Sequence, residues 1–209
     1  YAIYDAAGQN YLKYFFIDEV HIVQQWGLGF RSDFQILPGL IKDIKRICPS
    51  LITVMLTATL TDECYKTLNK LFKDEGEVPL LSSVQLRGEP SYWKYKTDTI
   101  QDKKSKLIEI LHIAPRPVII FTTLKKDAKD LLRTVQKEGF KRSRVFHGDT
   151  KDEERRIILD LWKEDKIDIV VATSAFGLGV NKSDVRTIIH ACIPETVDRF
   201  YQEVGRAGR

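Results

Sequence analysis

Two adjacent carboxylates, Asp18 and Glu19, follow three apolar residues in the segment YFFIDEVH, residues 14–21. The apolar run predicts a short buried strand, and ligands of open α/β sheets bind beyond the carboxyl ends of the strands. There, one carboxylate can hold a hard cation such as Mg²⁺ while its neighbour orients an attacking water. We therefore predict Asp18 as a Mg²⁺ ligand and Glu19 as the group that orients the water in nucleotide hydrolysis. The pair alone is also compatible with a solvated junction between a strand and a loop.

The elements that would position these acids alternate along the chain. Short β-rich runs alternate with amphipathic segments, which indicates an α/β fold with a mostly parallel sheet. Several runs are apolar throughout, as strands buried on both faces are. The predicted strands are Tyr14–Asp18, Ile52–Leu56, Val118–Phe121, Ser143–Phe146, Ile167–Ala172 and Arg186–His190.

Helices are predicted where apolar residues recur every three to four positions, in segments 125–138 and 151–165. Thr150 and Glu153 have the spacing of a capping box before the second helix, as do Ser32 and Gln35 before another. The apolar faces are Ala128, Leu131, Leu132 and Val135 in the first helix and Ile157, Ile158, Leu161 and Trp162 in the second.

Residues 75–101 interrupt this alternation with Gly, Pro and Ser and few helix signals. We interpret the interruption as a connection between two α/β lobes. The predicted organisation is a first lobe at 1–84, a connection at 85–100 and a second lobe at 101–209.

Bulk properties exclude several classes of protein. No apolar run approaches the roughly 18 residues of a membrane span, and the N-terminus has none of the features of a signal peptide. The three cysteines, at positions 48, 64 and 192, are far apart, which predicts a reducing compartment, cytoplasmic or nuclear, and no metal cluster. A formal net charge of +4 is compatible with nucleic acid without requiring it. Because the first residue is tyrosine, we expect a piece of a longer protein.

Six short segments occur in one order: DEVH (18–21), TAT (57–59), VIIFTT (118–123), FHGDT (146–150), VATSAFGLGVNKSDVR (171–186) and QEVGRAGR (202–209). This series resembles the motifs of helicase superfamily two and, within it, the RecQ-like DNA helicases. The resemblance covers the chain from Tyr14 to Arg209, and its order makes it far more specific than any single segment. It implies two RecA-like lobes with ATP bound between them, the first lobe incomplete at its N-terminus.

The resemblance also implies roles for the residues around ATP. Asp18 and Glu19 correspond to the Walker B acids, and His21 would connect hydrolysis to the other lobe. The hydroxyls of TAT would couple the nucleotide site to DNA movement. An arginine fork suits the charge that develops on a transferring phosphoryl group. The residues implied at the γ-phosphate or the nucleotide are Gln202, Arg206, Arg209, Gly179 and Asn181. A basic patch is the alternative for GRAGR alone.

Nucleic-acid contacts are implied in both lobes. Trp26, Phe30 and Arg31 form an aromatic loop shortly after the acids, where rings can stack on unpaired bases. The phosphate-binding positions implied in the second lobe are Thr122, Thr123, His147, Gly148, Thr173 and Lys182. Two alternatives stay open, namely that His147 only closes a turn and that Trp26 packs beneath its own loop.

Three features depart from the RecQ pattern. No P-loop motif occurs in the sequence, the aromatic loop is WGLGFR rather than WGHDFR, and RGEPSYW keeps only the proline and aromatic character of the usual R-P-N segment. The sequence therefore predicts a divergent RecQ-like ATP-dependent 3′-to-5′ DNA helicase acting on single-stranded and partly duplex DNA, with possible protein partners. The alternatives are a DExH RNA helicase, a non-enzymatic nucleic-acid-binding subunit, and a motor subunit of a repair or defence complex.

Overall fold

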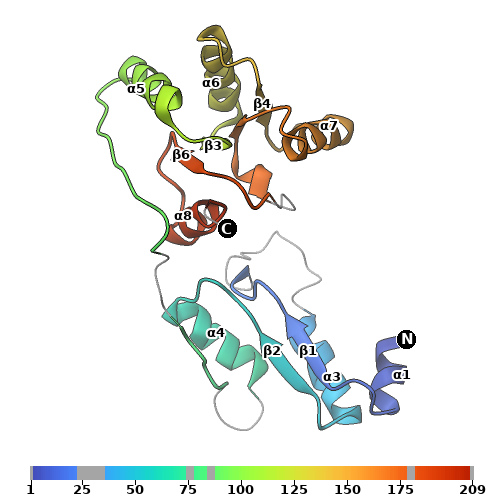
Figure 1. Ribbon diagram of the computed structural model, residues 1–209. Helices are drawn as coiled ribbons and strands as arrows, with labels where there is room; N and C mark the ends of the chain where they lie inside the picture. Colours follow the sequence, from blue (N-terminus) through green and yellow to red (C-terminus); the bar gives the residue numbers. More distant parts are fainter. Residues whose placement is uncertain (1, 23–35, 74–77, 84–87, 178–181, 208–209) are drawn as a thin grey trace. The chain divides into compact units, whose positions relative to one another are not determined.

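The computed structural model describes residues 2–22, 36–73, 78–83, 88–177 and 182–207 (Figure 1). The chain divides into two compact units, Tyr1–Val84 and Gln85–Arg209. Each unit combines helices with parallel strands, so the predicted α/β class is confirmed. In the part of the chain that the structure describes, every helix is too short or too polar to cross a bilayer.

Among its described residues, the first unit holds two parallel strands and three helices. Figure 1 shows their arrangement. Strand β1 pairs with β2 from Tyr14 opposite Ile52 to Ile17 opposite Met55. The elements are α1 (Ala2–Gly8), β1 (Tyr14–Ile17), α3 (Leu37–Ile47), β2 (Ile52–Met55) and α4 (Asp62–Phe72). Helix α4 begins at Thr61, whose side chain accepts a hydrogen bond from the Cys64 amide.

Apolar side chains fix the carboxyl end of β1 in this unit. Ile17 and Val20, on either side of the acid pair, are buried together with Ile41, Cys64 and Leu68. Because both neighbours of the acids are anchored in the core, the turn between them has little freedom to move.

The second unit is built on one parallel sheet with the strand order β4-β5-β3-β6. The central strands β3 and β5 are buried along their whole length, as the apolar runs predict. The elements are α5 (Ile100–Ile113), β3 (Val118–Phe121), α6 (Lys125–Lys137), β4 (Ser143–Phe146), α7 (Asp152–Lys163), β5 (Ile169–Ala172), the 3₁₀ helix η2 (Ser174–Gly177), β6 (Thr187–His190) and α8 (Val197–Val204).

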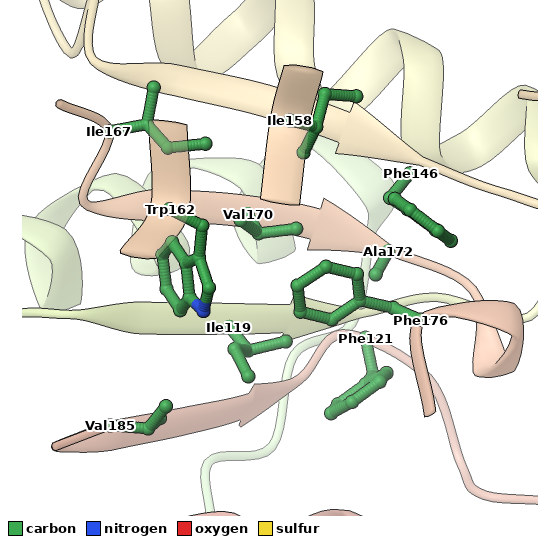
Figure 2. Close-up of a cluster of buried hydrophobic side chains, with 10 residues drawn as sticks. All are labelled: Ile119, Phe121, Phe146, Ile158, Trp162, Ile167, Val170, Ala172, Phe176 and Val185. Carbon is green, nitrogen blue, oxygen red and sulfur yellow. The ribbon is translucent and has the colours of Figure 1, made fainter. Parts of the chain in front are cut away.

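Alternate residues of β3 and β5 face two separate cores. On one face, Trp162 of α7 and Phe176 of η2 meet edge to face at 6.2 Å, among the ten residues that Figure 2 shows. On the other face, Leu107 and Leu111 of α5 pack with the buried stripe of α6. The sheet therefore has helices on both faces, and its strand ends are held from both sides.

The helix predictions need two corrections. Thr150 does not form a capping box with Glu153, because α7 has its N-cap at Lys151 without a side-chain hydrogen bond and the Thr150 hydroxyl accepts from the His147 amide instead. Ile157 is 58% exposed rather than buried, since Ile158 and Trp162 define the face of α7 that meets the core. The other predicted cap, at Ser32 and Gln35, lies outside the described residues.

Strand boundaries also shift by one or two residues. Predicted strands 118–121 and 143–146 are confirmed, whereas β1 and β2 each end one residue earlier than predicted, and β5 and β6 begin at Ile169 and Thr187. Residues 88–99, within the predicted connection, contain no helix or strand.

Candidate functional site

The acid pair lies at the carboxyl end of β1, where the backbone turns at once. Glu19 has a φ of 52°, a left-handed conformation uncommon for a residue with a side chain. Its amide donates to Oδ1 of Asp18 at 2.8 Å. The turn is tied to β2 on both sides, since the Leu56 amide donates to the Ile17 carbonyl and the Val20 amide donates to the Leu56 carbonyl, at 2.8 and 3.0 Å. Both carboxylates are exposed, so a ligand can reach them.

His21 joins the acid pair to the TAT segment. Its Nδ1 lies 2.9 Å from Oγ1 of Thr57 and 3.2 Å from Oε2 of Glu19, and the residue is only 8% exposed. The Thr57 hydroxyl already donates to the carbonyl of Thr59 at 2.7 Å, so it accepts from His21, and the imidazole carries its proton on Nδ1. One side chain therefore contacts both the predicted water-orienting acid and the predicted coupling segment.

Thr57 also organises the TAT segment itself. Besides its bond to the Thr59 carbonyl, its Oγ1 accepts from the Thr59 amide at 3.2 Å. By contrast, Oγ1 of Thr59 is buried without a hydrogen-bond partner among the described residues. The two threonines of TAT thus differ sharply, one bonded three times and the other left unsatisfied.

In the second unit, the carboxyl ends of the parallel strands bring three predicted contact residues to one edge of the sheet. Thr122 follows β3, His147 follows β4 and Thr173 follows β5, each with 6% of its surface exposed. The Thr122 amide donates to the Ala172 carbonyl and the Thr173 amide donates to the Phe146 carbonyl, which continues the sheet ladder one step beyond the strands. Thr123, the next residue after Thr122, is exposed.

His147 closes a turn. Its amide donates to the Thr150 hydroxyl, and the Thr150 amide donates to the His147 carbonyl, both at 3.0 Å. Arg155 locks the same turn by donating to the carbonyls of Thr150 and Gly148. These contacts favour the structural alternative for His147, and a nucleic-acid contact by its side chain stays a prediction.

An exposed ion pair borders this turn. Nζ of Lys125, in the first turn of α6, lies 2.5 Å from Oδ1 of Asp149. The hydrogen bond from Lys125 lowers the pKa of the Asp149 carboxyl below its ordinary value. The ammonium group of Lys125 at this edge of the sheet is therefore already paired with the Asp149 carboxylate.

The structure does not bring Lys182 to the edge that holds Thr122 and Thr173. Its side chain is 7% exposed, and its ammonium lies 2.7 Å from Asp165 and 3.1 Å from Asp184, residues that precede β5 and β6. Burial opposes the charged form, but the hydrogen bonds to the two aspartates outweigh it and raise the pKa of Lys182. Lys182 therefore sits in an ion-pair network near the amino ends of the strands, and its contact with nucleic acid stays a prediction.

The described part of the GRAGR segment, residues 205–207, follows directly after helix α8. Gln202 is exposed, and the amide of Arg206 donates to the Glu203 carbonyl at 3.2 Å. Between them, a Cβ on Gly205 would lie 3.1 Å from the Tyr201 carbonyl, so glycine permits the tight turn that ends the helix.

Sequence reasoning missed an anchor of α8. Nε2 of His190, the last residue of β6, lies 2.8 Å from Oε2 of the buried Glu203. A pocket of about 20 Å³, room for about one water, is lined by Glu203 together with Thr122, Thr123, Ser174 and Cys192, among others. No local spacing signals the pair, because its members are 13 residues apart and meet only through the fold.

Several predicted residues lie outside the described part of the chain. These are Trp26, Phe30 and Arg31 of the aromatic loop, Gly179 and Asn181 near the nucleotide, and Arg209 at the end. Among the described residues, no group of three or more His, Cys, Asp or Glu could hold a metal ion.

Comparison with known proteins defines the family. Residues 102–209, about half of the chain, match the helicase conserved C-terminal domain, and the chain belongs to that family. It is 31% identical over 198 residues to the probable ATP-dependent DNA helicase RecS of Bacillus subtilis. It is also 31% identical to ATP-dependent DNA helicase Q1 of Rattus norvegicus and 30% identical to ATP-dependent helicase SGS1 of Saccharomyces cerevisiae.

The predicted RecQ resemblance is therefore confirmed over most of the chain. These alignments cover 95%, 92% and 92% of this chain but 39%, 31% and 13% of the RecS, Q1 and SGS1 sequences. The chain thus spans well under half the length of the curated relatives that it matches.

Solved structures agree on the fold. A Dbp5 variant from Saccharomyces cerevisiae aligns with 99% of this chain and 53% of its own at a TM-score of 0.70 and 20% identity. The DUF1998 helicase MrfA, solved with DNA and AMPPNP, aligns with 99% of this chain and 31% of its own at a TM-score of 0.66 and 23% identity. The predicted RecA-like architecture is confirmed, and at these identities the likeness concerns the fold alone.

Proposed function

We propose that the intact protein is an ATP-driven motor that moves 3′-to-5′ along single-stranded DNA and separates duplexes. The observation that carries the proposal is the double contact of His21, which joins Glu19 of the acid pair to Thr57 of TAT. A contact between the water-orienting acid and a separate hydroxyl-bearing segment is what a coupled nucleotide hydrolase needs. The similarity to DNA helicases over more than nine-tenths of the chain supports DNA as the nucleic acid along which the motor moves.

Asp18 has the properties of a Mg²⁺ ligand. Its Oδ1 accepts a hydrogen bond from the Glu19 amide, and the residue is exposed. Mg²⁺ in phosphate sites commonly takes one or two carboxylates together with substrate phosphates. When bound, the cation would neutralise charge on the phosphates, and Asp18 would hold it beside Glu19.

Glu19 would orient the attacking water. Its side chain is 47% exposed, so water can reach it, and its Oε2 lies 3.2 Å from Nδ1 of His21. That contact holds the carboxylate in place beside Asp18. If nucleic-acid binding displaces TAT, Thr57 moves, and with it His21 and Glu19. Nucleic-acid binding would thereby change the rate of hydrolysis.

The second unit would supply the arginines and a phosphate-binding surface. Arg206 and Arg209, with Gln202, would reach the γ-phosphate, where guanidinium groups stabilise the developing charge. Thr123 is exposed at the carboxyl edge of the sheet and is available to a strand phosphate, whereas Thr122 donates its hydroxyl to backbone carbonyls. Phosphate contacts of this kind position a strand without reading its sequence.

The test is ATP hydrolysis by the intact protein with single-stranded DNA, duplex DNA and RNA compared. We expect the strongest stimulation from single-stranded DNA. Glu19→Gln should retain ATP binding and lose roughly 10²-fold or more in turnover, the scale of general-base catalysis. Glu63→Gln is the matched control, because Glu63 is an exposed acid of α4 in the same unit. Greater stimulation by RNA would favour an RNA helicase, and DNA binding without hydrolysis would favour a non-enzymatic subunit.

A further inference from the structure

The buried pair formed by His190 and Glu203 joins the sheet of the second unit to α8. Nε2 of His190 lies 2.8 Å from Oε2 of Glu203, and the two side chains are 13% and 9% exposed. A carboxylate is costly to bury unless it is paired and hydrogen-bonded. The contact therefore accounts for how Glu203 is accommodated inside the unit.

Aromatic rings hold the imidazole in one orientation. Phe121 of β3 stacks on His190 with ring centres 5.6 Å apart and an interplanar angle of 21°. Phe200, from α8 itself, packs against the same imidazole at 5.2 Å. These two contacts restrict the imidazole, whose Nε2 is directed at Glu203. The other carboxylate oxygen of Glu203 lies 3.9 Å from Nε of Arg199.

The main chain of Glu203 is fixed to Arg206. Its carbonyl accepts the Arg206 amide, and in the same turn the Ala207 amide donates to the Val204 carbonyl at 3.0 Å. Ala207 then packs against the core cluster around Trp162. Glu203 thus bonds the sheet through its side chain and Arg206 through its backbone.

We propose that His190 and Glu203 are a positioning pair that holds Arg206 in place for phosphoryl transfer. The proposal rests on the proposed function and adds to it two residues that do not themselves touch ATP. A preorganised arginine stabilises transition-state charge without moving during the reaction. Loss of the pair would release the turn after α8 while leaving the acid pair of the first unit unchanged.

The experiment is steady-state ATP hydrolysis by the intact protein with single-stranded DNA, comparing substitutions at both positions. Glu203→Ala and His190→Ala should each lower kcat by roughly 10-fold or more, since a misplacement of about 1 Å can cost about 10²-fold. KM for ATP should stay near the wild-type value, because the lost interaction belongs to the transition state. The double alanine variant should be no slower than either single variant, since both remove one interaction.

Two further variants separate positioning from general stability. Glu203→Gln can still accept a hydrogen bond from Nε2–H of His190, so it should keep kcat close to wild type even if the alanine variants fold poorly. Glu195→Ala is the matched control, because Glu195 is an exposed acid that also pairs with Arg199. It should leave kcat and KM unchanged.

The outcomes distinguish this inference from the proposed function. No hydrolysis by the wild-type protein overturns the proposed function and this inference with it. An active wild type combined with unchanged kcat in both alanine variants overturns the inference alone. A large loss of kcat in Glu203→Gln also overturns it, because the hydrogen bond would then not be what positions Arg206.

Discussion

The Thr57 hydroxyl makes three hydrogen bonds, and Thr57→Val removes all of them while keeping the β-branched shape. The hydroxyl accepts from Nδ1 of His21 and from the Thr59 amide, and it donates to the Thr59 carbonyl. Each protein hydrogen bond contributes about 0.5–1.5 kcal/mol net. Because His21 can keep its contact with Oε2 of Glu19, two bonds are lost without replacement, and we expect a loss of roughly 1–3 kcal/mol from the free energy of unfolding of the first unit.

The chain offers a matched control two residues away. Oγ1 of Thr59 is buried with no hydrogen-bond partner among the described residues. Replacing an unsatisfied hydroxyl by a methyl group removes a desolvation cost, so Thr59→Val should leave the free energy of unfolding unchanged or raise it.

Amide hydrogen exchange in the intact protein reports on the first unit separately from the second. The informative amides are those of Val20 and Leu56, which tie the acid turn to β2. Thr57→Val should speed their exchange by about 10- to 100-fold through local opening, and Thr59→Val should not. The same Thr57 variant should bind ATP and lose most of its stimulation by DNA. Equal exchange in the two variants, or wild-type exchange in Thr57→Val, would show that the Thr57 hydroxyl does not hold the acid turn in place.

Three other predictions concern the core of the second unit, the aromatic loop and the last arginine of the chain. Trp162→Ala should destabilise the second unit by about 3–5 kcal/mol in chemical denaturation, whereas Ile157→Ala, at a residue 58% exposed, should cost far less. Similar costs would contradict the assignment of Trp162, and not Ile157, to the buried face of α7. Trp26→Ala should keep the melting temperature and ATP affinity and lose DNA stimulation of hydrolysis, and a lowered melting temperature with stimulation retained would make Trp26 structural. Arg209→Lys should hydrolyse ATP almost as poorly as Arg209→Ala, and wild-type turnover in the lysine variant would make Arg209 a surface charge.

The buried sheet of the second unit could be predicted from the sequence because its apolar runs coincide with strands that are buried in the structure. Strands β3 and β4 begin and end where predicted, and the stripe of Ala128, Leu131 and Val135 on α6 is buried. In a sheet covered on both faces, a short apolar run bounded by polar residues is most favourable as a buried strand whose ends lie at the polar residues.

The errors arose where two local interactions compete for the same group. The spacing of Thr150 and Glu153 fits a capping box, but the Thr150 hydroxyl bonds the His147 amide and closes a turn instead. Helix α5 was not predicted, since the first half of its sequence is polar and Leu107 and Leu111 are its buried residues.

The candidate site was predictable in its residue types and only partly in its geometry. The apolar run before Asp18 and Glu19 predicted that they lie at a strand end, and the structure puts them there. The contact of His21 with Thr57 spans 36 residues and depends on the pairing of β1 with β2, so no local pattern contains it. The pair of His190 and Glu203 likewise needs the packing of α8 against the sheet.

Strand displacement by the intact protein tests whether it is a 3′-to-5′ DNA helicase. The substrates are two DNA duplexes of identical sequence, one with a 3′ single-stranded tail and one with a 5′ tail, each incubated with ATP and Mg²⁺. We expect ATP-dependent separation of the 3′-tailed duplex, little separation of the 5′-tailed duplex, and none of either by Glu19→Gln. A folded wild-type protein that separates neither duplex, or a Glu19→Gln variant that separates them as well as the wild type, would contradict this function.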